Sequence, residues 1–135
     1  MFTVIDESTI PVLVDEFYAR VRAHPRLGPV FADAIAEDGW PAHLRKMYAF
    51  WSSVMLTSGR YKGNPVAVHA AVAGISPELF PLWLDLFEAT ARDLFVADLA
   101  ARFCAKARSI AESLKLALFF RPDRPWPEDL RRRAG

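Results

Sequence analysis

The stretch WPAHLRKMYAFWSSVM, residues 40–55, indicates the structural class of this 135-residue chain. Its large side chains recur three and four positions apart, which is the spacing of one helix face. That face carries His43, Met47, Phe50, Trp51 and Val54. Proline near the start and Gly59 beyond the end are typical of helix boundaries. The pattern predicts a helix over residues 41–58, with a histidine at the head of an otherwise apolar face.

Helical spacing also recurs on both sides of this stretch, and alternating strand patterns are missing. The expected helical segments are residues 9–23, 27–35, 66–72 after a cap at Asn64, 76–95 with a start at Ser76-Pro77, and 98–120 with a cap at Asp98. The chain is therefore predicted to be all-α. Residues 1–120 are expected to form one domain and residues 121–135 a C-terminal tail, which contains an arginine cluster.

Composition narrows the function classes. The net charge is +1, from 17 basic and 16 acidic residues, so no nucleic-acid partner is expected. The single cysteine, Cys104, excludes an internal disulfide and a cysteine-based zinc site. We expect no signal peptide, because acidic residues interrupt the apolar runs near the N-terminus, and no run of about 18 uncharged apolar residues occurs. The expected location is cytoplasmic, without a membrane partner.

The side chains that could carry chemistry are few. The three histidines, His24, His43 and His69, lack the spacing that places two metal ligands on one helix face. Taken singly, His43 is typical of a partly buried histidine bonded to a backbone carbonyl, and His69 of a surface or satisfied histidine. Tyr18 and Trp83 are typical of core residues. Taken together, two histidines on separate helices with aromatic residues around them are compatible with a pocket for a flat apolar cofactor.

The chain resembles the truncated haemoglobins, and most closely their third group. The resemblance spans about residues 5–120 and does not include the tail. It is carried by residues 17–22 (FYARVR), 27–31 (LGPVF), His43, Phe50-Trp51, 61–65 (YKGNP), His69, Ser76-Pro77 and 83–87 (WLDLF).

This resemblance implies a shortened globin fold, a two-over-two helical sandwich around haem b. It makes His69 the ligand of the iron. Tyr18, His43 and Trp83 become the side chains that face a bound gas or take part in catalysis. The haem contacts that the resemblance implies are Phe31, His43, Met47, Phe50, Trp51 and Trp83. We assign Arg45, Tyr61 and Lys62 to the haem propionates. Met47 departs from the aliphatic residue expected at its position.

The function implied by the resemblance is reversible binding of dioxygen and other diatomic gases. Nitric oxide dioxygenase or peroxidase-like activity would need an external reductase, because the chain offers no flavin or nicotinamide domain. Two alternatives stay open. One is a haem-free helical interaction module, in which the pocket is packed core. The other is a haem-based gas sensor that acts through a partner. The expected oligomeric state is a monomer or a weak homodimer.

Overall fold

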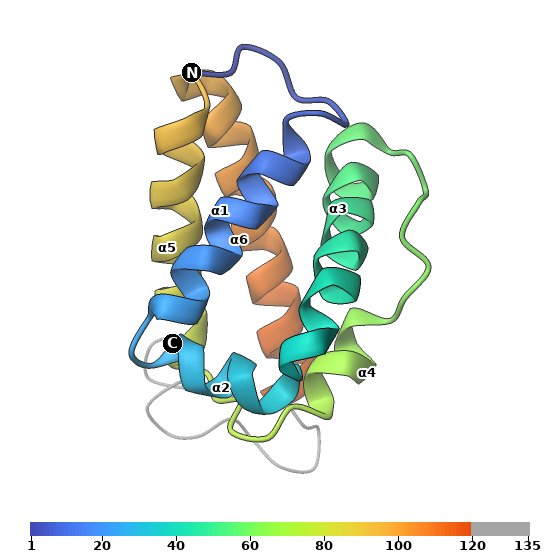
Figure 1. Ribbon diagram of the computed structural model, residues 1–135, viewed down its shortest axis with the longest axis vertical. Helices are drawn as coiled ribbons and strands as arrows, with labels where there is room; N and C mark the ends of the chain where they lie inside the picture. The colour runs from blue at the N-terminus through green and yellow to red at the C-terminus, as the bar shows by residue number, and fades with distance from the viewer. Residues whose placement is uncertain (120–135) are drawn as a thin grey trace.

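The computed structural model describes residues 1–119, which form six α-helices and one short 3-10 helix and contain no β-strand (Figure 1). The helices are α1 (Ile10–Ala23), α2 (Leu27–Ala34), α3 (Trp40–Leu56), α4 (Pro65–Ala70), α5 (Leu79–Leu94) and α6 (Ala97–Phe119), with the 3-10 helix at Glu37–Gly39. The all-α prediction is thus confirmed. Phe120 and the expected tail, residues 121–135, lie outside the described residues.

The helix boundaries follow local chemistry. The predicted cap at Asn64 is confirmed, since its side-chain oxygen accepts a hydrogen bond from the Ala67 N–H at 3.1 Å. The predicted helix start at Ser76-Pro77 is wrong. The backbone carbonyls of these two residues accept the N–H groups of Leu79 and Phe80, and the Ser76 side chain caps nothing. The segment is therefore a turn that leads into α5.

Asp98 is a second correction at a helix start. Helix α6 begins at Ala97, so Asp98 lies inside its first turn and does not cap it. Its carboxylate there still interacts favourably with the positive end of the helix dipole. Within residues 1–119, no helix has both the length and the apolarity to cross a membrane.

The helices pack as two pairs. Helices α5 and α6 pack along each other, α1 packs against α3, and α1 also crosses α5 (Figure 1). This confirms the expected two-over-two sandwich. Helix α4 contacts α6, at the end of the molecule opposite the N-terminus. The short α2 covers the end of α1, and Gly28 is required there because a Cβ would lie 2.7 Å from the Arg22 carbonyl oxygen.

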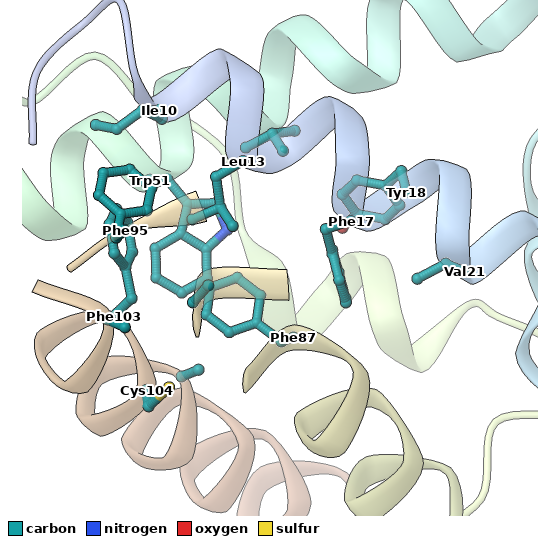
Figure 2. Packing of buried hydrophobic residues seen from close by; sticks show 14 of the residues in the cluster. Ile10, Leu13, Phe17, Tyr18, Val21, Trp51, Phe87, Phe95, Phe103 and Cys104 are labelled. Atoms are coloured by element: carbon teal, nitrogen blue, oxygen red, sulfur yellow. The ribbon is translucent and has the colours of Figure 1, made fainter. Parts of the chain in front are cut away.

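A column of stacked aromatic rings joins the helices (Figure 2). The Phe87 ring of α5 is 1% exposed and stacks on Trp51 of α3 with centroids 4.8 Å apart. On its other side it stacks on Trp83 at 5.5 Å, and it meets Phe17 of α1 edge-on at 5.2 Å. Phe103 of α6 completes the contacts at 6.4 Å. One side chain therefore connects four helices.

The segment between α3 and α4 is fixed by polar contacts. The Glu7 carboxylate accepts hydrogen bonds from the buried Ser52 hydroxyl at 2.9 Å and from Arg60 at 2.7 Å. Ser53 accepts the backbone N–H of Tyr61 at 2.9 Å. These bonds connect the N-terminal segment, the end of α3 and the start of the loop that leads to α4.

Truncation of Phe87 should have the largest effect on stability. We expect Phe87→Ala to lower the free energy of unfolding by about 3–5 kcal/mol, because it removes a buried ring and its contacts to three other helices. Leu116→Ala is the matched control, since Leu116 is 47% exposed and should change stability by less than about 0.5 kcal/mol. Urea unfolding measures both. A similar small change in both variants would contradict the importance of the column.

Candidate functional site

His69 is oriented by its own helix. Its Nδ1 lies 2.6 Å from the carbonyl oxygen of Pro65, one turn earlier, so Nδ1–H donates to that carbonyl. This bond selects the tautomer in which Nε2 carries no hydrogen and has a free lone pair. A histidine arranged in this way is prepared to bind a metal ion through Nε2. The side chain is half-buried.

His43, in contrast to His69, has a buried ring nitrogen without a hydrogen-bond partner in the described part of the chain. Its ring meets Tyr18 edge-on at 4.9 Å and Trp40 at 5.3 Å. Among the residues that the structure describes, His43 Nε2 is the one buried side-chain nitrogen or oxygen without a hydrogen-bond partner. The backbone partner that is typical of a lone buried histidine is therefore missing here and is present at His69. An unpartnered buried polar atom indicates a place for a ligand.

The surroundings of His43 lower its pKa. Burial, together with smaller effects of the charges of Lys46 and His69, lowers the pKa of His43 to about 4. His43 is therefore neutral near pH 7 and can either donate or accept one hydrogen bond. Because His69 contributes to this shift, it lies within electrostatic range of His43.

Tyr18 and Trp83 supply the remaining polar hydrogens. Within residues 1–119 neither the Tyr18 hydroxyl nor the Trp83 indole N–H makes a hydrogen bond. Burial raises the pKa of Tyr18, so its hydroxyl stays protonated and can donate. The Phe17 ring connects the two, since it meets Tyr18 at 4.9 Å and Trp83 at 5.5 Å. Phe31 packs on the other edge of Tyr18 at 5.9 Å.

The other residues assigned from the sequence are spread more widely. Met47 and Phe50 are half-buried on α3, and the Phe50 ring meets Tyr61 edge-on at 5.2 Å. Trp51 lies in the core against Phe87, away from the Tyr18 and His43 rings. Arg45 and Lys62 are exposed and form no ion pair in the described part of the chain.

Trp40 was missed by the sequence reasoning. It is buried and contacts the rings of Tyr18, Phe31 and His43. The Arg22 guanidinium lies over the Trp40 ring, 4.5 Å from its centroid. The spacing of three residues between Trp40 and His43 was the available signal, because it places both on one helix face.

The arrangement fits haem. In the described part of the chain no three histidine, cysteine, aspartate or glutamate side chains gather as a metal site. A metal ion bound by His69 alone would thus need its other ligands from a cofactor. The aromatic surroundings suit a flat apolar ring, and the unpartnered Nε2 of His43 suits a small polar ligand beside it.

A two-over-two helical sandwich with these two histidines is the architecture of a shortened globin. No protein-family model matches the chain. The chain is 30% identical over 120 residues to the group 3 truncated hemoglobin ctb of Campylobacter jejuni, covering 87% of this chain and 94% of that protein. The crystal structure of a group III truncated hemoglobin from the same organism matches with a TM-score of 0.82, at the same identity and coverage. The chain belongs to the group III truncated haemoglobins.

His43 should make the fold sensitive to acid. Its pKa is about 4 in the folded chain and about 6.5 when unfolded, so the unfolded chain takes up the proton first as pH falls. Between about pH 6.5 and 4 the free energy of unfolding should decrease by about 1–2 kcal/mol, after allowance for solvent screening of a half-buried ring. Urea unfolding before haem is added measures this. His43→Phe should lack this part of the decrease, and His24→Ala should retain it; an unchanged slope in His43→Phe would contradict the explanation.

Proposed function

We propose that the protein binds haem b through His69 Nε2 and reversibly binds dioxygen and other diatomic gases. Two observations together carry the proposal: the His69 ring is oriented by its bond to Pro65, and the buried Nε2 of His43 has no partner within residues 1–119. The names of the two relatives support it, since both are truncated hemoglobins. When bound, haem supplies an iron centre with one coordination position for a diatomic ligand.

The chain's own polar hydrogens then decide how long a ligand is retained. Tyr18 and Trp83 can donate hydrogen bonds in a site enclosed by aromatic rings, where such bonds are stronger than in water. Neutral His43 can donate a third. Three donors around one small ligand favour slow release over bulk transport.

The remaining residues would hold the cofactor. Phe31, Met47 and Phe50 offer apolar contacts from α2 and α3, and Trp51 supports them from the core. We assign the propionates to Arg45, Tyr61 and Lys62. The exposure of Arg45 and Lys62 and their lack of ion pairs within residues 1–119 support this assignment, because both cations keep their donors available.

His69→Ala should abolish stable haem uptake, because it removes the ligand of the iron. Added imidazole should restore part of the uptake. Haem titration followed by absorption spectroscopy measures both. The matched control is His24→Ala, which changes a histidine at the end of α1 that bonds to the N–H groups of residues 26 and 27. Unchanged haem uptake in His69→Ala would favour the haem-free interaction module.

Tyr18→Phe and Trp83→Phe should each speed dioxygen dissociation. One lost hydrogen bond is worth about 0.5–1.5 kcal/mol, which corresponds to about two- to tenfold in the rate. Stopped-flow displacement by carbon monoxide measures it. Tyr48→Phe is the control, because the Tyr48 hydroxyl donates to Asp15 outside the site. Unchanged rates in both Tyr18→Phe and Trp83→Phe would remove this account of ligand retention.

Redox turnover of nitric oxide or peroxide is a further prediction for the same donors, which could stabilise developing negative charge. It requires reducing equivalents from a separate reductase, and a cytoplasmic location would provide one. A sensor role would instead require that ligand binding changes a surface recognised by a partner. Steady-state consumption of nitric oxide with an added reductase separates turnover from binding alone.

A further inference from the structure

A cavity lies beside the turn between α5 and α6. This turn is at the end of the molecule where the chain begins (Figure 1). Its volume is about 530 Å³, which falls within the range of small-molecule sites. Its accessible apolar lining comes from Met1, Ala97 and Ala101, and Phe95 and Cys104 form a floor beneath them that is only 1% and 2% exposed. The side chains of Phe95 and Cys104 are visible at this side of the core in Figure 2. None of its lining residues belongs to the site of His43 and His69.

Two arginines also line this cavity and share one acid. Arg108 pairs with Glu88 at 2.6 Å, and Arg92 approaches the same carboxylate at 3.7 Å. Neither arginine pairs with any other carboxylate within residues 1–119. The Glu88 side chain is only 16% exposed, whereas both arginines reach solvent. One positive charge therefore has no carboxylate partner within residues 1–119, and the remaining N–H donors of the two arginines face solvent at the cavity.

The cysteine in the floor acts as an apolar wall. Cys104 is buried, and burial together with the Glu88 charge raises the pKa of its thiol. A neutral, buried thiol is a weak nucleophile and packs like a small hydrophobic side chain. The cavity is consequently suited to non-covalent binding.

We propose that this cavity binds a small aliphatic carboxylate, with the chain on Ala97 and Ala101 and the carboxylate on Arg92 and Arg108. Arginine forms its strongest contacts with carboxylates, through paired N–H donors. The apolar lining adds free energy in proportion to the buried hydrocarbon area. An inorganic anion would leave this lining unused, and an aliphatic cation would be repelled by the arginines.

Isothermal titration calorimetry of the full chain, as isolated, with decanoate tests the proposal. We expect one saturable site. Arg92→Gln combined with Arg108→Gln should weaken binding at least tenfold, because it removes both donors. Glu88→Gln should tighten binding severalfold, because it releases both arginines from their only acidic partner in the described chain. The opposite signs of these two changes separate a charge effect from a general disturbance of the fold.

A cavity-filling pair of variants gives the location. Ala101→Trp should abolish decanoate binding, because the indole fills the cavity. Ala105→Trp is the matched control, one turn further along α6, exposed and outside the lining, and should bind normally. Circular dichroism checks that both fold. Decyltrimethylammonium, with the same chain and the opposite charge, should show no saturable binding.

Three results would overturn the proposal: no saturable decanoate binding, equal binding by the cationic analogue, or undiminished binding to Ala101→Trp. If the double arginine variant fails to fold, Ala101→Trp and Glu88→Gln still decide. The proposal is independent of haem, so its failure would leave the function proposed above untouched.

Discussion

The buried Phe87 ring is the contact on which the rest of the structure depends. It lies between the indoles of Trp51 and Trp83 and meets Phe17 edge-on, so it connects α3, α5 and α1. Phe17 in turn contacts Tyr18. The same column that stabilises the helical pairs thereby sets the positions of the two hydrogen-bond donors. Packing and the candidate site are two aspects of one aromatic arrangement.

The two histidines show how local geometry gives one residue type two roles. Helix α4 has six residues, too few to be stable by itself. It depends on the cap at Asn64 and on the contact of the His69 ring with its own backbone. His43 lies near the start of a long helix, enclosed by Tyr18 and Trp40, and its Nε2 has no partner within the described residues. One ring is held by its own helix, and the other has a nitrogen without a partner within residues 1–119.

Helical spacing was sufficient to predict the long helices, and α1 and α6 each bury one regular face. The start of α5 could not be predicted in this way. Ser76 and Pro77 carry the signals of a helix start. Their carbonyls instead close a turn, and α5 begins after it, at Leu79. Such turns depend on backbone angles that neighbouring segments impose. The local cap at Asn64, in contrast, needs only residues three apart.

The candidate site was predicted from aromatic and histidine residues together with the family resemblance. The spacing of residues could not reveal that His43 has no partner, since that depends on how α1 and α3 meet. The same holds for Arg22, which pairs with Glu37 at 2.7 and 2.8 Å and covers Trp40. Both contacts join segments that are distant along the chain. Trp40 was predicted only as part of a helix start, although it forms a wall of the site.

The absorption spectrum of the purified protein tests the central claim most directly, recorded oxidised, reduced with dithionite, and reduced under carbon monoxide. The account predicts a Soret band that shifts sharply when carbon monoxide is added, and its loss in His69→Ala. The absence of a Soret band, even after haem is added back, would contradict the proposed haem-dependent function.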